Sequence, residues 1–320
     1  MTIADLLTIY RPLLGWTLIG WVSGRLLPAA VPTHLGKFLF WVGVPVSIAA
    51  FLRHAHLSAA LWLAPTIAWI AMLLGVGCAW WWSQRSPIAN LHTDDPASPR
   101  SPQTRGSFLL AAMLGNTGYI GYPVALALVG PHYFAWTLFY DLLGSTPGAY
   151  GLGVAIAARF SDSPPSNRWQ ALQTMLKNPA LWSFAIGIAG RNYPLPAMLE
   201  TSLHNFAWAI VALSLILIGM RLSQLSALQR LRPALISLGI KMLLVPLVLG
   251  LVLWALGVTG FVYRALLLQM AMPPAFATLV IAEAYELDQE FAVTTLVTGC
   301  FGLLILLPFW IWLFNIAGIR

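Results

Sequence analysis

The sequence predicts an all-α membrane protein with ten transmembrane helices, arranged as two inverted repeats of five. Three observations support this prediction: an apolar composition, ten apolar stretches separated by polar residues, and helix breaks at matching places in the two halves. Of 320 residues, 59% are hydrophobic and 8% are charged, whereas a soluble domain carries about 25% charged residues. This composition excludes a water-soluble enzyme and a disordered chain, and makes the lipid bilayer the expected environment.

The net charge of +7 does not indicate a nucleic-acid partner. The basic residues lie between the apolar stretches and do not form a stripe along one face. Most of them fall in loops that share one side of the membrane if the N-terminus is outside. The positive-inside rule therefore predicts that both termini are extracytoplasmic. A short, loop-poor chain of this kind is expected in a bacterial inner membrane.

A transmembrane helix needs about 20 mostly apolar residues. The expected helices cover 6–27, 36–53, 58–82, 107–129, 133–159, 178–193, 197–220, 233–256, 262–284 and 290–316. The polar insertion 83–106 is expected to be a flexible loop. A cytoplasmic linker, 161–177, separates the first repeat, 1–160, from the second, 178–320. In the first expected helix, Gly20 and Gly24 form a GxxxG motif, which hints at a dimer contact.

The fourth and ninth stretches are both expected to be interrupted in the middle. The fourth reads Gly-Asn-Thr-Gly-Tyr-Ile-Gly-Tyr-Pro over 115–123, and a helix interior disfavours Gly by about 1 kcal/mol and Pro by about 3 kcal/mol. In the ninth, Pro273 and Pro274 remove two consecutive N–H donors. A packing kink explains one such stretch equally well. Two breaks at corresponding places, with 115–119 aligned on 272–276, favour a shared site.

Inverted repeats with corresponding interrupted helices are typical of secondary transporters. The breaks place two half-helix N-termini, each with partial positive charge, near the middle of the membrane. We therefore expect the breaks to cross and to form the site for an anionic substrate. The expected substrate-binding residues are Asn116, Thr117, Gly118, Tyr119, Pro123, Met272, Pro273 and Pro274.

Three ionisable residues are candidates for ion coupling or charge recognition. Asp141 lies inside the fifth expected helix, where an unpaired carboxylate is costly. It carries a proton during transport, pairs with a basic group, or accepts structural hydrogen bonds at a backbone break. Lys241, in the eighth expected helix, faces Asp141 or the substrate, or else extends to the membrane surface. Glu283 ends an apolar helix and is expected to face the mobile core.

No metal site and no cofactor is expected, and no motif indicates an enzyme. P-loop, HExxH and GxSxG patterns are absent from the sequence. Cys78 and Cys300 lie in apolar stretches without a CxxC pattern. They are expected to be two small buried side chains.

The sequence resembles the auxin efflux carrier family in its bacterial, malonate-transporter-like branch, which is related to the bile acid sodium symporters. The resemblance rests on 115–123, on the two prolines with Ala-Glu-Ala-Tyr at 282–285, and on Lys-Asn-Pro at 177–179. It implies an elevator-type homodimer. Helices 1, 2, 6 and 7 would form the scaffold, and helices 3–5 and 8–10 the transport domain. The chain lacks the long central loop and the Asn-Pro-Asn-Thr break of the plant exporters, so the expected substrate is a small organic acid anion.

Three functions remain open at this stage. The first is a carrier that exports or exchanges a carboxylate, driven by the membrane potential or coupled to protons through Asp141. The second is a sodium-coupled organic anion symporter of the bile acid type. The third is a receptor that binds its ligand at the breaks without moving it.

Overall fold

The computed structural model describes residues 3–28, 30–53, 58–85, 101–161, 173, 176–223 and 231–316, which are helical almost throughout. The α-helices are α1 (Ile3–Leu26), α2 (Ala30–Phe38), α3 (Val44–Leu52), α4 (Leu63–Arg85), α5 (Pro102–Met113), α6 (Gly121–Leu128), α7 (Phe134–Tyr140), α8 (Thr146–Gly148), α9 (Val154–Phe160), α11 (Pro179–Gly190), α12 (Ala197–Ser223), α13 (Leu231–Gly239), α14 (Val245–Ala255), α15 (Gly260–Met270), α16 (Phe276–Ala284) and α17 (Gln289–Ile316). Among the residues described, four π-helical segments join consecutive α-helices: Leu39–Gly43, Asp141–Ser145, Ala149–Gly153 and Ile240–Leu244.

Several of these helices have the length and apolar composition of transmembrane helices. Within the described ranges, five helical runs are long and apolar enough to cross one: Ala30–Leu52, Ala59–Arg85, Ala197–Met220, Leu231–Ala255 and Gln289–Phe314. The shorter helix α11 is also apolar. Because the chain is helical and carries these runs, it is a polytopic membrane protein, as its composition predicts.

Two expected connections are only partly described. The predicted loop 83–106 is too long, because α4 continues to Arg85 and α5 already begins at Pro102. The hydroxyl oxygen of Ser101 accepts a hydrogen bond from the Thr104 amide, and proline suits the first turn of a helix. Residues 86–100 lie outside the described residues, as does most of the predicted linker 161–177.

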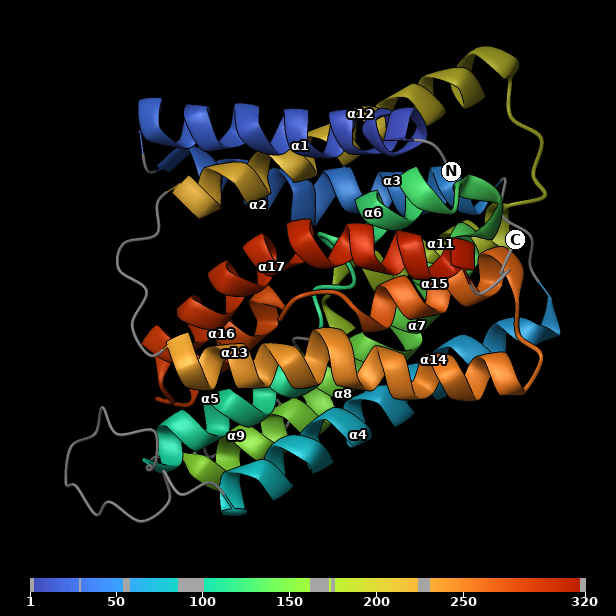
Figure 1. The fold of residues 1–320 in the computed structure, drawn as a ribbon. Helices are drawn as coiled ribbons and strands as arrows, with labels where there is room; N and C mark the ends of the chain where they lie inside the picture. The colour runs from blue at the N-terminus through green and yellow to red at the C-terminus, as the bar shows by residue number, and fades with distance from the viewer. Residues whose placement is uncertain are drawn as a thin grey trace.

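The helices form two groups on either side of the centre of the molecule. In the view of Figure 1, α1, α3 and α12 lie along one side, and α4, α5, α9 and α14 lie along the opposite side. Helix α1 packs along α12, and α3 packs against both α11 and α12. Helices α15 and α16, the two parts of one interrupted helix, lie between the two sides, and the other interrupted helix runs from α5 on one side to α6 near the other (Figure 1). Both interrupted helices therefore reach the centre of the protein.

The contact between α1 and α12 depends on glycine. A Cβ added at Gly20 would lie 2.0 Å from the carbonyl oxygen of Ile216, and one added at Gly219 would lie 1.9 Å from that of Thr17. A Cβ added at Gly24 would lie 2.7 Å from the backbone of Met220 in α12. The GxxxG motif thus brings two helices of one chain together. It is not free for the dimer contact expected at Gly20 and Gly24.

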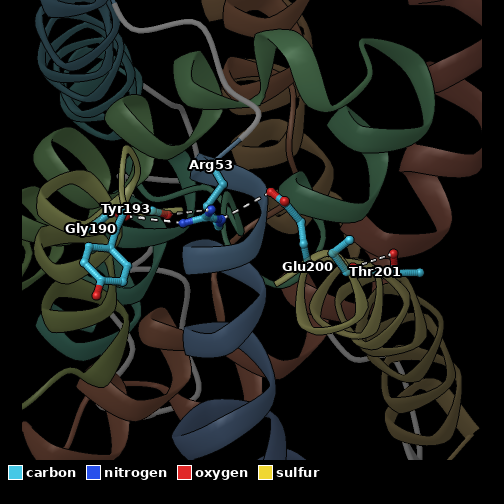
Figure 2. A network of polar contacts seen from close by, with 6 residues as sticks. Arg53, Gly190, Tyr193, Glu200 and Thr201 are labelled. Carbon is cyan, nitrogen blue, oxygen red and sulfur yellow. Dashed lines mark hydrogen bonds and ion pairs between the residues drawn. The ribbon is translucent and has the colours of Figure 1, made fainter. Parts of the chain in front are cut away.

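Arg53 joins the ends of three helices in this first group. It follows α3, and its guanidinium donates hydrogen bonds to the carbonyl oxygens of Gly190 (3.3 Å), the last residue of α11, and Tyr193 (3.0 Å), just beyond it. Its Nε atom lies 3.4 Å from a carboxylate oxygen of Glu200 in α12. Figure 2 shows Arg53 reaching both sides of this junction. The Arg53 side chain is 13% exposed and that of Glu200 is 36% exposed, so the contacts differ in their solvent screening.

Replacing Arg53 by methionine is expected to destabilise this group of helices by about 1–2 kcal/mol, because two carbonyl oxygens lose their hydrogen bonds to a charged donor. Replacing Glu200 by glutamine is expected to cost less than about 1 kcal/mol, because the ion pair is partly open to solvent. Thermal unfolding in detergent measures both. Equal losses would show that the ion pair, and not the two carbonyl contacts, holds the junction.

Candidate functional site

The two predicted helix breaks are present, and they pair with each other. Residues 114–120 separate α5 from α6, and residues 271–275 separate α15 from α16. The two segments cross in the middle of the molecule (Figure 1) and form an antiparallel bridge between Gly115 and Pro274. The Asn116 amide donates to the Pro273 carbonyl (2.7 Å), and the Ala275 amide donates to the Leu114 carbonyl (3.1 Å).

Proline makes this crossing asymmetric. Directly opposed residues of an antiparallel pair can exchange two hydrogen bonds, but Pro273 has no N–H to return to Asn116. The Asn116 carbonyl instead accepts from the amide of Gly121, the first residue of α6, at 3.0 Å. Because Pro273 cannot donate to it, the Asn116 carbonyl is free to accept the first hydrogen bond of α6.

A cavity of about 510 Å³ lies beside the crossing. Its wall includes Phe40 and Val44 before and at the start of α3, and Leu217 and Ile218 of α12, so it lies between the crossing and the first group of helices. Asn178, just before α11, and Glu283, near the end of α16, also line it. The cavity therefore extends from the crossing toward the side where α11 begins and α16 ends.

The structure brings some of the predicted site residues to this cavity and leaves others away from it. Those on its wall are Asn116, Thr117, Gly118, Tyr119, Asp141 and Glu283. Met272 is fully buried, and Pro273 and Pro274 pack toward α17. Pro123 lies in the first turn of α6 and faces a separate, smaller hollow. These four residues are therefore not part of the cavity wall.

Asp141 is held at the break by two hydroxyl groups. The Thr117 hydroxyl donates to Oδ1 (2.5 Å), and the Tyr122 hydroxyl donates to Oδ2 (2.6 Å). The residue is 8% exposed, so these bonds offset part of the cost of placing a carboxyl group inside the membrane. The described side chains form one ion pair, between Arg53 and Glu200, and Asp141 is not part of it. Asp141 therefore lacks a basic partner in this part of the chain.

Lys241 approaches the same break from another direction. It is 3% exposed, and its Nζ atom donates to the carbonyl oxygen of Met270, the last residue of α15, at 2.8 Å. A Cβ added at Gly115 would lie 3.1 Å from that Nζ atom. Of the alternatives left open for Lys241, extension to the membrane surface does not occur, because the Nζ atom is buried at a helix C-terminus, where a positive charge is favoured. Lys241 is not on the cavity wall.

Asn116 leaves a hydrogen-bond donor at the cavity. Its side-chain oxygen accepts from the amide of Tyr119 at 3.2 Å, which fixes the orientation of the side chain. Its Nδ2 atom is buried and has no partner among the described atoms. A buried amide donor without a partner is costly. The site can therefore satisfy this group with an acceptor atom of a ligand.

Sequence analysis missed the π-helical segments, which border the site. Asp141 opens one of them, Lys241 lies in a second, and the wall residues Phe40 and Tyr150 lie in the other two. A signal was available, because three of the segments end two residues before a proline: Pro45, Pro147 and Pro246. A proline inside a helix removes one hydrogen bond and clashes with the preceding turn, and a wider π turn relieves this conflict.

The prolines of the second break rest on a glycine of α17. A Cβ added at Gly299 would lie 2.8 Å from Cδ of Pro274 and 3.0 Å from Cβ of Pro273. Any larger side chain at this position would require α17 or the proline segment to shift. The position of the crossing is therefore set partly from behind, by α17.

A polytopic helical protein with a cavity at crossed, interrupted helices has the architecture of a membrane transporter. The comparisons with known proteins agree. A family model described as "Membrane transport protein" matches residues 168–311. An uncharacterized transporter of Methanocaldococcus jannaschii is 29% identical over 215 residues, covering 65% of this chain and 68% of that protein. Another, from Methanothermobacter thermautotrophicus, is 26% identical over 279 residues, covering 86% of this chain and 87% of its own length.

These matches confirm the family resemblance drawn from the sequence. The second half of the chain, from 168 to 311, is similar to a family of membrane transport proteins, and both relatives are named as transporters.

Replacing Gly299 by alanine is expected to destabilise the protein by about 1–3 kcal/mol, because the new methyl group overpacks the contact with the two prolines. The matched control is Gly302→Ala on the same helix, where nothing lies within 4 Å of the added Cβ. That change is expected to be neutral or to stabilise by up to about 1 kcal/mol. Thermal unfolding in detergent compares the two, and equal effects would contradict the support assigned to Gly299.

Proposed function

We propose that this protein is a secondary transporter that carries a small organic acid across the membrane, with the acid bound at the crossing. Transport is the activity named for the family and for its relatives, and it is not an enzyme class. The observation that supports an acid as substrate is the buried Nδ2 donor of Asn116 beside the cavity. A carboxylate supplies the acceptor atoms that this donor lacks.

The ends of the half-helices favour the same kind of ligand. Helix α16 begins at Phe276, on the cavity wall, and no side chain caps its N-terminus. A helix N-terminus carries a partial positive charge that attracts an anion. Tyr119 and Phe276, which occupy matching positions in the two repeats, meet edge to face at 6.2 Å beside this end. They offer an apolar surface next to the polar groups.

The charges on the wall favour an acid with few negative charges. Asp141 and Glu283 both line the cavity, and the described wall residues include no Lys, Arg or His. Each further negative charge on the ligand is repelled by these two groups. In our proposal, Asp141 carries a proton during part of the cycle, which lowers this repulsion and couples transport to protons.

The helix packing is consistent with an elevator movement. In this proposal, α1, α2, α3, α11 and α12 form the scaffold and dimer surface, and the helices α4–α9 and α13–α17 move with the substrate. The same proposal includes ten transmembrane helices in two inverted repeats, with both termini outside. It also includes a homodimer in a bacterial inner membrane. With that orientation, the cavity opens to the cytoplasm.

Asn116→Ala and Asp141→Asn are each expected to reduce flux of a labelled carboxylate into proteoliposomes by at least about tenfold, the effect of losing a hydrogen bond to a charged group. The control is Asn205→Ala, because Asn205 is exposed on α12 and away from the cavity. Normal flux in both folded variants would refute the assigned site.

The same assay separates the two alternatives. Flux that requires sodium and is indifferent to pH would replace the proton-coupled carrier by a sodium symporter. Binding of the carboxylate without counterflow of label would replace it by a receptor.

Glu283→Gln is expected to raise the flux of a dicarboxylate relative to a monocarboxylate by about two- to fivefold. It removes one repelling charge, and the effect is modest because Glu283 is exposed and screened. Glu290→Gln is the control, since Glu290 is also exposed but lies off the cavity wall. Competition between the two acids in proteoliposomes measures the ratio, and an equal ratio in both variants would contradict a role of Glu283 in charge selection.

A further inference from the structure

A second hollow lies beyond the crossing, on the other side of Tyr122 from the large cavity. It measures about 20 Å³ and is lined by Ser47 and Phe51 of α3, Pro123 and Leu126 of α6, Phe134 of α7 and Ser214 of α12. Tyr122 lines both this hollow and the cavity. The space between the two groups of helices is thus wide on one side of Tyr122 and nearly closed on the other.

Aromatic rings close the narrow side. The ring of Phe134 meets that of Phe51 edge to face at 5.3 Å, and Phe51 meets Trp208 of α12 at 5.7 Å. Phe134 therefore joins α7 to α3 and, through Phe51, to α12. Such edge-to-face pairs are attractive beyond the area that they bury.

Tyr122 connects this closure to the carboxyl group at the crossing. Its ring meets Phe134 edge to face at 5.3 Å, while its hydroxyl donates to Oδ2 of Asp141 at 2.6 Å. A continuous series of contacts therefore runs from Asp141 through Tyr122 and Phe134 to Phe51. The hydrogen bond fixes the rotation of the Tyr122 ring, and that ring supports Phe134 from the cavity side.

We propose that Tyr122, Phe134 and Phe51 form an aromatic latch that closes the side opposite the cavity, and that Tyr122 is the positioning residue that links the latch to Asp141. A proton or substrate arriving at Asp141 competes with the Tyr122 hydroxyl, loosens its ring and weakens the contact between Phe134 and Phe51. The latch rests on the proposed transport function, because binding at Asp141 would weaken the contact of α7 with the scaffold helix α3 and so permit the movement.

The latch can be tested without a substrate. Ser47→Cys serves as a reporter in a background in which the protein's two cysteines, Cys78 and Cys300, are replaced by alanine. Ser47 is buried in the hollow, about one helical turn before Phe51 on α3. A membrane-impermeant maleimide, added to right-side-out and to inside-out vesicles, measures access to the reporter from each side separately.

Phe134→Leu and Tyr122→Phe are each expected to increase labelling from the side opposite the cavity by roughly five- to tenfold. Because both act on one contact, the double variant is expected to label no faster than the faster single variant. Phe51→Leu, which weakens the latch from the scaffold side, is expected to reproduce Phe134→Leu.

Two control variants separate the latch from general loosening. Phe139→Leu removes another ring contact from α7, to Phe184 of α11 at 5.2 Å. Tyr263→Phe removes the hydroxyl of another buried tyrosine, on α15. Neither is expected to change labelling, and thermal unfolding confirms that each variant is folded.

Unchanged labelling in Phe134→Leu and Phe51→Leu would overturn the latch. Effects of Phe134→Leu and Tyr122→Phe that multiply in the double variant would overturn the link to Asp141. The outcome is distinguishable from failure of the proposed function. If labelling responds as expected but no carboxylate is transported, the latch stands and the substrate assignment falls. If carboxylates are transported and labelling does not respond, the latch alone falls.

Discussion

The structure depends on one constraint, that unwound backbone inside a membrane must find its hydrogen-bond partners within the protein. Each broken segment meets part of this requirement for the other. Asn116 donates to the second segment, and Ala275 donates to the first. Neither break is stable alone, because straightening one would leave polar groups of the other without partners. The two broken helices are therefore held together at the point where the substrate is proposed to bind.

The two segments contribute differently to the site. The first has the chemically active surroundings: the carboxyl group of Asp141 contacts it through Thr117, and the ammonium group of Lys241 approaches it at Gly115. The second has two prolines and rests on α17. A proline pair restricts the backbone and cannot donate, so this segment acts as a rigid support. The polar groups of the first segment thus lie against a backbone segment that proline restricts.

Local sequence predicted the breaks, because the penalties of glycine and proline in a helix belong to single positions. It left open whether Asp141 carries a proton, pairs with a basic group or accepts structural hydrogen bonds, because Thr117 and Tyr122 are brought to it only by folding. The same limit explains Lys241, whose partner is a backbone carbonyl that no sequence pattern marks. The GxxxG motif hinted at a dimer contact, and the fold shows that its partner is α12 of the same chain. Ten transmembrane helices and the assignment of scaffold and transport domain stay predictions.

The π-helical segments also change what a helix can contact along its length. An α-helix turns by about 100° per residue, so one residue accommodated in a wider turn rotates everything beyond it by about that angle. Helix α13 packs against α17 and α5, whereas α14, the continuation of the same run, packs against α15 and α4. The change of neighbours falls at the segment Ile240–Leu244, which contains Lys241. A helical wheel drawn through the whole run would place these two contact surfaces on the wrong faces.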